Sequence, residues 1–66
     1  SCRADFLVSR NKCRYIAEVK TGKIATNPAF PATRRQLLEY AHVYQDVDGL
    51  LLVDVQNRRV LEVAFP

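Results

Sequence analysis

The sequence is short of the residues that keep a chain unfolded or cross-link a small one. Only two of its 66 residues are glycine and three are proline, which excludes a collagen-like or disordered chain. Its two cysteines, Cys2 and Cys13, are too few for a disulfide framework, so we expect free thiols in a reducing, cytoplasmic compartment. The longest apolar run covers residues 49–53, far short of the roughly 20 that a membrane helix needs. The first residues also lack a signal-peptide pattern, and we expect no membrane segment.

Positive charge and apolar side chains are what the sequence does contain. Ten Lys and Arg residues stand against seven Asp and Glu residues, which gives a net charge of +3. Seven of the ten are arginine, the side chain that best forms paired hydrogen bonds to phosphate, so the charge suits a polyanionic partner. The chain is 48% hydrophobic, enough for one small domain. A domain of this size buries only about 60% of its unfolded surface, so we expect a homo-oligomer or part of a longer chain.

Two strands are expected before residue 20. Residues 4–8 and 13–19 are rich in β-formers, and Asn11 and Lys12 between them suit a two-residue hairpin turn. The register of such a hairpin pairs residues whose numbers sum to 23, which places Asp5 opposite Glu18. Glu18 and Lys20 then point to the same face, because side chains alternate along a strand. The two cysteines fall at opposite ends of this hairpin, more than about 30 Å apart and beyond disulfide reach.

One helix and two further strands are expected after it. Residues 21–32 contain two prolines and no periodic pattern, which indicates an irregular loop. A helix is predicted from Thr33 to about Gln45, with Thr33 as its N-cap and Gln36 as a possible capping-box partner. Residues 50–55 and 60–65 are predicted strands, joined by a two-residue turn at 57–58. The first of them does not alternate, so we expect it to be covered on both faces.

The resulting order is β-β-α-β-β in a single domain over residues 1–66. We predict an α+β fold: a small mixed four-stranded sheet with one helix on a face. The other face of such a sheet would be uncovered unless a second copy or further segments of a longer chain packed on it.

Asp5, Glu18 and Lys20 form the constellation that indicates chemistry. Facing carboxylates repel each other and weaken a sheet unless something compensates. A divalent cation would do so, and hard oxygen ligands suit Mg²⁺ or Mn²⁺ completed by water and phosphate. Lys20 would hold the attacking water and stabilise charge on phosphoryl oxygens. The pattern therefore predicts a metal-dependent phosphodiesterase.

These residues resemble the signature of the PD-(D/E)XK nuclease superfamily. Ala4-Asp5 followed by Ile16-Ala17-Glu18-Val19-Lys20 is similar to its metal-binding motif, and Gln36-Leu37-Leu38-Glu39-Tyr40 looks like the Q-x-x-x-Y element of the RecB-like branch. The resemblance implies a reduced restriction-endonuclease-like core that cleaves DNA with Mg²⁺ or Mn²⁺. It assigns the metal to Asp5, Glu18 and the Val19 carbonyl, the water to Lys20, and a supporting role to Gln36 and Tyr40. The chain departs from the family in having Ala4 where proline is usual and in lacking, over these residues, the helix that usually precedes the first core strand.

Basic residues after the motif are candidate contacts to DNA. Arg34 and Arg35 lie at the predicted helix start, where phosphate would offset the unfavourable helix dipole, and Lys23 lies in the loop before it. All three have an alternative interpretation as solvated surface charges.

Structural alternatives also exist for the helical pair and for the whole domain. Gln36 would serve only as a cap for Thr33, and Tyr40 would only pack in the core. The alternative function is a non-catalytic nucleic-acid-binding or assembly module on the same scaffold, in which the acidic residues and Lys20 form a surface ion-pair cluster.

Overall fold

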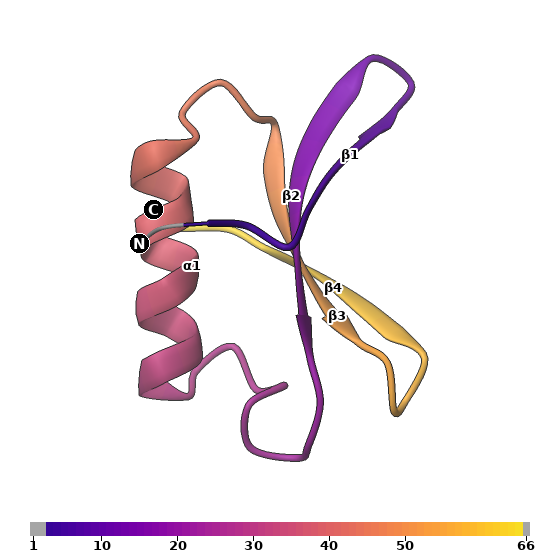
Figure 1. Cartoon of the computed structure of the whole chain (residues 1–66), viewed down its shortest axis with the longest axis vertical. Helices are drawn as coiled ribbons and strands as arrows, with labels where there is room; N and C mark the ends of the chain where they lie inside the picture. The colour runs from indigo at the N-terminus through magenta and orange to yellow at the C-terminus, as the bar shows by residue number, and fades with distance from the viewer. Residues whose placement is uncertain (1–2, 66) are drawn as a thin grey trace.

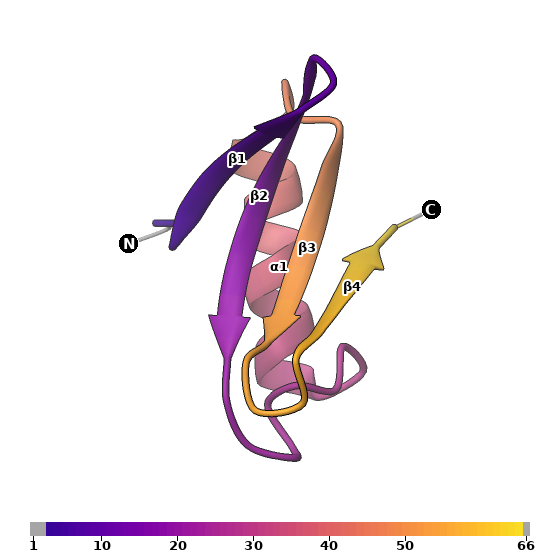
Figure 2. The same cartoon turned by 90° about the vertical axis from the view of Figure 1, so that its right-hand side faces the viewer.

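The computed structural model describes residues 3–65, and the following account is restricted to them. Five elements follow one another along the chain: β1 (Phe6–Arg10), β2 (Cys13–Lys20), α1 (Pro31–Val43), β3 (Gly49–Asp54) and β4 (Arg59–Val63). The strands form one sheet in the order β1-β2-β3-β4, and α1 packs against one face of it (Figures 1 and 2). Only the central pair, β2 and β3, is parallel. The predicted α+β class, element order and mixed sheet are confirmed.

The first hairpin follows the predicted register. Asn11 and Lys12 both have positive φ, 52° and 69°, as a type I′ turn requires, and this turn matches the right-handed twist of the strands. Pairing runs from Arg10 with Cys13 to Phe6 with Ala17. The ladder ends there, so Asp5 lies just before β1 and its predicted pairing with Glu18 is not part of the sheet. Cys2 lies outside the described residues, and the Cys13 thiol is free.

The helix starts earlier than predicted and its cap is different. Phe30 is the N-cap and Pro31 the first helical residue, a position that suits proline because its missing N–H would have no partner there. Thr33 lies inside the first turn, buried, with its hydroxyl donating to the Ala25 carbonyl at 2.8 Å. The predicted Thr33 cap is therefore wrong, and the helix ends at Val43, slightly before the predicted end at about Gln45. The hydroxyl instead ties the preceding loop to the helix.

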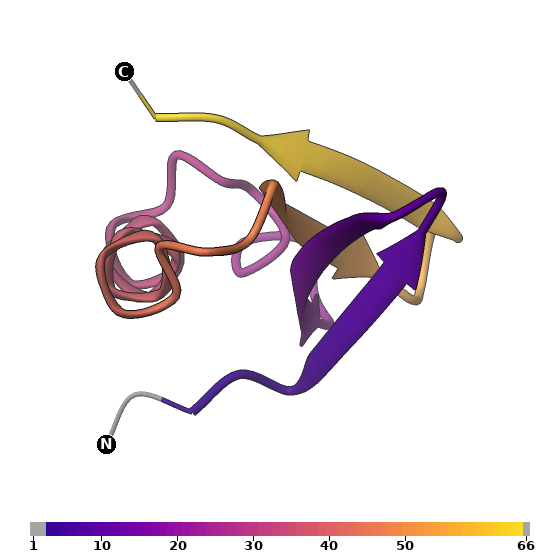
Figure 3. The ribbon, with the colours of Figure 1, turned by 90° about the horizontal axis from the view of Figure 1, so that it is seen from above.

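The core lies between α1 and one face of β2 and β3. The parallel register aligns Ile16 with Leu50 and Lys20 with Asp54, so these side chains share the face beneath the helix. Ile16 and Leu50 pack there with Leu37 and Tyr40 of α1, and the view from above shows the helix on that side alone (Figure 3).

The opposite face of the sheet is open in the described chain. Burial alternates along β3, where Leu50 and Leu52 are buried while Leu51 and Val53 are half-buried. The prediction that this strand is covered on both faces is wrong. Phe6 on the open face is 58% exposed. An oligomer or a longer chain would cover such a surface, and both stay predictions. No helix within residues 3–65 is long and apolar enough to cross a membrane.

The second hairpin has a longer turn than predicted. Asp54 pairs with Arg59 and Val53 with Val60, so residues 55–58 form a four-residue loop. The cause is Asp54, which is buried at the end of β3. Its carboxylate accepts hydrogen bonds from the Asn57 backbone N–H at 3.2 Å and from Asn57 Nδ2 at 2.9 Å. These bonds close the turn two residues earlier than a turn at 57–58 would.

Acid is expected to weaken this hairpin through Asp54. The Asn57 side-chain bond, helped by the Asn57 N–H and by Arg59, lowers the pKa of Asp54 below its usual 3.8 despite burial, which opposes the shift. The stabilisation is thus present above pH 3.8 and is lost as the pH falls below it. Thermal melts should show a steeper acid decline in the wild type than in Asp54→Asn. Asp46→Asn, which alters an exposed ion pair with Arg14, should decline like the wild type, and parallel curves for all three would contradict the assignment.

Candidate functional site

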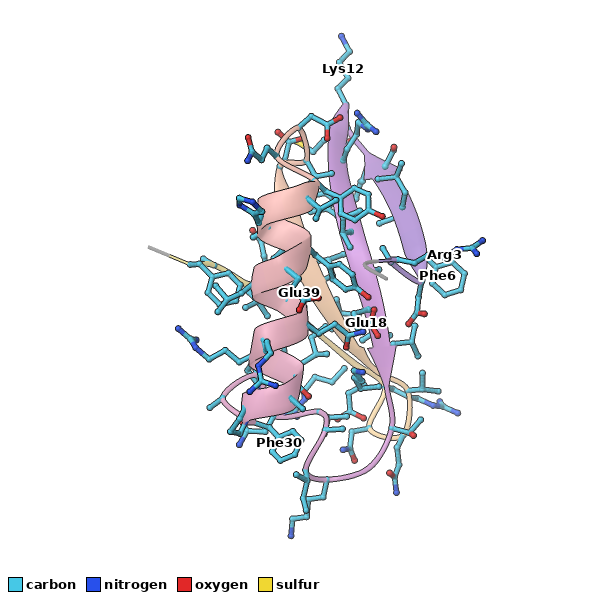
Figure 4. All side chains as sticks on the ribbon, turned by 60° about the vertical axis from the view of Figure 1, so that its left-hand side comes forward. Arg3, Phe6, Lys12, Glu18, Phe30 and Glu39 are labelled. Carbon is cyan, nitrogen blue, oxygen red and sulfur yellow. The ribbon has the colours of Figure 1, made fainter. Side chains whose placement is uncertain are left out.

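Glu18 is the centre of the candidate site. It projects from β2 under α1 and is only 4% exposed, and Figure 4 shows it between the helix and the sheet. Burying a carboxylate is costly unless polar partners compensate. Oε1 accepts a hydrogen bond from the Tyr40 hydroxyl at 2.8 Å, and Oε2 lies 3.4 Å from Lys20 Nζ. Each carboxylate oxygen therefore has one partner: a neutral hydroxyl for Oε1 and a cation for Oε2.

Lys20 lies on the same face of β2, as predicted. It is the last residue of the strand, and its side chain is 25% exposed. The ammonium therefore reaches both the buried carboxylate and the solvent side of the site.

Tyr40 connects the helix to the rest of the site. Its hydroxyl accepts a hydrogen bond from Gln36 Nε2 at 3.0 Å and lies 2.8 Å from Glu18 Oε1 and 2.9 Å from the Arg3 carbonyl oxygen. A phenol has one proton to donate, so the two acceptors share it. Burial first, and then the hydrogen bond to Glu18 and its charge, raise the pKa of Tyr40, and the charge of Asp5 adds to this effect. The phenol is therefore a neutral donor at physiological pH.

Asp5 lies just before the first residue of β1 and contacts β2. Its Oδ2 accepts a hydrogen bond from the Val19 N–H at 3.0 Å. The bond holds the carboxylate beside the peptide that follows Glu18, although Asp5 itself is exposed. The Glu18 and Asp5 carboxylates thus both raise the pKa of Tyr40, but Glu18 is buried and Asp5 is in solvent. The role of the Val19 carbonyl as a metal ligand stays a prediction.

The helical residues meet as their spacing indicated, which resolves two alternatives. Gln36 bonds to Tyr40 one turn further on, and because Thr33 is not the N-cap, the capping-box interpretation of Gln36 is wrong. Tyr40 does pack in the core, and its hydroxyl also donates to Glu18, so core packing is not its only role in the structure. Its supporting role in catalysis stays a prediction.

The three candidate DNA contacts separate in space. Arg35 lines a groove together with Lys20 and Gln36. Arg34 instead places its guanidinium 5.1 Å from the centre of the Phe65 ring, on the side of the C-terminal segment. Lys23 is exposed in the connection between β2 and α1. Among these candidates, Arg35 is the one that shares a surface with Lys20.

One contact of the site, and one buried acid that lies next to it in the sheet, were not predicted. The Arg3 carbonyl is a backbone acceptor, for which no residue type is a signal. Asp54 lies opposite Lys20 in the parallel register, at the end of an apolar strand. Its residue type was no signal for burial, because acids are usually exposed, and the strand that it faces depended on the parallel pairing.

The carboxylates suit a magnesium ion that is completed by substrate. Residues 3–65 contain no group of three or more His, Cys, Asp or Glu side chains arranged to hold a metal. Mg²⁺ commonly takes one or two protein carboxylates and fills its other positions with water and phosphate oxygens. Asp5 and Glu18 supply that number, so the donor set fits Mg²⁺ or Mn²⁺ bound together with a phosphate rather than in a closed cage.

The chain matches no protein-family model, no curated protein and no solved structure.

Proposed function

We propose that this domain is a Mg²⁺- or Mn²⁺-dependent nuclease that hydrolyses phosphodiester bonds in DNA. The observation that carries the proposal is the buried Glu18 carboxylate, held between a lysine and a tyrosine with a second carboxylate on the adjacent chain segment. A buried charge of this kind is not explained by folding stability, because well-packed apolar residues at the same positions would usually make the domain as stable or more stable. A buried carboxylate beside the solvent-reaching Lys20 supports a chemical role.

Each residue has a distinct task in the proposed reaction. Asp5 and Glu18 hold the cation, which when bound supplies positive charge against the phosphate and lowers the pKa of a water. The Lys20 ammonium donates hydrogen bonds to the attacking water and to the phosphoryl oxygens as they gain charge. The water oxygen bonds to phosphorus while the bond to the leaving sugar oxygen breaks; one water proton ends on the leaving hydroxyl and the other is released. Tyr40 and Gln36 keep Glu18 in place.

The topology supports the finer assignment to a reduced restriction-endonuclease-like core. The Glu-x-Lys segment lies on a central strand, Asp5 lies just before its antiparallel neighbour, and Gln36 and Tyr40 come from the helix that links the two parallel strands. This arrangement of the motif residues supports the proposed core.

The proposal is tested first by metal dependence with a matched pair of variants. Wild-type protein should cleave DNA in the presence of Mg²⁺ or Mn²⁺, and EDTA should abolish the cleavage. The cation should also raise the Tm of the wild type. Asp5→Asn keeps an oxygen to accept the Val19 N–H but loses the charge, so cleavage and the metal-induced shift in Tm should both disappear. Asp46→Asn, an exposed acid outside the site, should keep both. Cleavage that persists in EDTA or in Asp5→Asn would refute the proposed site.

A non-catalytic nucleic-acid-binding module is the second candidate. What favours it is that no group of three or more potential metal-ligand side chains exists among the described residues, so the site has two carboxylates and no third ligand side chain. A module of this kind would bind DNA with an affinity that depends on salt but not on Mg²⁺, and it would leave the DNA intact.

A further inference from the structure

A groove with an aromatic side chain in its lining lies beside the site. It has a volume of about 320 Å³ and lies between the first turns of α1 and the connection that precedes them. Phe30 lines it together with Ala25 and Ala32, and Figure 4 shows the Phe30 ring at the foot of the helix. An aromatic ring with small apolar neighbours leaves room for a flat apolar group. We call this surface the Phe30 groove.

The polar residues of the Phe30 groove connect it to the proposed site. Lys20 and Gln36, which bond to Glu18 and Tyr40 respectively, both line the groove. Arg35 and Glu39 line it as well. A guanidinium binds phosphate oxygens, and a carboxylate accepts hydrogen bonds from the exocyclic amino groups of bases. A second hollow of about 260 Å³, beside Tyr44 and Phe65, contains none of the proposed site residues.

We infer that the Phe30 groove binds one unpaired nucleobase of a DNA strand, stacked on Phe30, while the neighbouring phosphodiester lies at Lys20. The inference rests on the proposed nuclease function and names its substrate class, single-stranded DNA or a single-stranded end. Proteins bind single strands by stacking bases on aromatic side chains and following the backbone with cations, which is the combination of Phe30, Arg35 and Lys20. A base within a duplex is already stacked on both faces, so it enters such a groove only after unpairing.

The experiment measures binding without metal, so that it does not depend on cleavage. Fluorescence anisotropy in EDTA would compare a labelled single-stranded oligonucleotide with the duplex of the same sequence. The wild type should prefer the single strand. Phe30→Leu should weaken single-strand binding at least about fivefold, the low end of the loss expected for one stacked base, and leave duplex binding unchanged. The salt dependence of binding should be unaltered, because no charge is removed.

Three further variants separate stacking from general damage. Phe30→Tyr keeps a ring and should bind like the wild type. Phe6→Leu removes an exposed ring on the open face of the sheet and should also bind like the wild type. Ala32→Leu fills the groove from the helix side and should weaken single-strand binding even if Phe30→Leu proves unstable.

The outcomes distinguish the inference from the proposed function. If Phe30→Leu and Ala32→Leu bind the single strand as tightly as the wild type, or if the wild type prefers the duplex, the base groove is refuted whether or not the protein cleaves. If single-strand binding depends on Phe30 but Mg²⁺ produces no cleavage, the groove stands as a binding site and the nuclease proposal fails. If neither form of DNA binds without metal, the base groove is refuted, and the cleavage assay alone decides the nuclease proposal.

Discussion

Replacing Lys20 with alanine is expected to lower the rate of Mg²⁺-dependent DNA cleavage by about 10²- to 10³-fold, the loss typical when one charge-stabilising donor is removed. The ammonium lies 3.4 Å from Glu18 Oε2 at the exposed edge of the site, where it can reach a phosphate. Because the charge on the phosphoryl oxygens grows in the transition state, the loss should fall on kcat and much less on substrate affinity. Single-turnover cleavage at saturating protein measures it directly.

The control for Lys20 is another lysine on the same hairpin. Lys12 lies at the tip of the β1–β2 turn and extends away from the site (Figure 4). Lys12→Ala removes the same charge and should cleave at the wild-type rate. Lys20→Arg keeps the charge but replaces a compact ammonium with a planar guanidinium, so its rate should lie between the two. Full activity in Lys20→Ala would show that the lysine has no part in the chemistry and would favour the non-catalytic module.

The parts of the fold that the sequence predicted are those determined by local geometry. Asn11 and Lys12 tolerate the positive φ of a type I′ turn, and that turn sets the whole register of β1 and β2. The two-residue period of a strand then places Glu18 and Lys20 on one face. The helix start was missed because the Thr33 hydroxyl bonds to the carbonyl of Ala25 in the preceding loop. Threonine is a good cap in isolation, but a tertiary acceptor was available here.

The turn of the second hairpin and the contacts around Glu18 were not predictable, because they depend on segments that are distant in the sequence. Nothing local shows that Asp54 is buried and closes a four-residue turn, since acids are usually exposed. The spacing of Gln36 and Tyr40 predicted that they share a helix face. The way in which the helix packs on the sheet then decides what this face contacts. It brings the Tyr40 hydroxyl to Glu18 and to the Arg3 carbonyl, and the sequence did not show either contact. The candidate residues on the strand were therefore predictable from residue types and strand period, while the contacts that surround them were not.

Tyr40→Phe should lower the free energy of unfolding at neutral pH by about 1–3 kcal/mol, the cost of leaving buried polar groups without a partner. The substitution keeps the ring in the core but removes the hydroxyl that Glu18, Gln36 and the Arg3 carbonyl share. For a domain of this size the expected fall in Tm is about 5–20 °C. Tyr44→Phe is the matched control, because Tyr44 is half-buried one turn further on, its ring 6.1 Å from that of Tyr40. It should melt close to the wild type.

The difference between wild type and Tyr40→Phe should shrink in alkali. The raised pKa of Tyr40 means that its hydroxyl stays protonated in the folded chain at a pH where the unfolded chain ionises it. The stability it contributes is complete below the usual tyrosine value of about 10 and is lost above it, by at most about 1.4 kcal/mol per pH unit. Melts of both proteins from neutral pH to above 10 would show the two curves approach. Because the other titrating groups are common to both, curves that stay parallel would mean that Tyr40 is solvated and that Glu18 does not depend on it. A Glu18 carboxylate that needs no support from the helix would leave Gln36 and Tyr40 outside the site, and the case for a nuclease would then rest on Asp5, Glu18 and Lys20 alone.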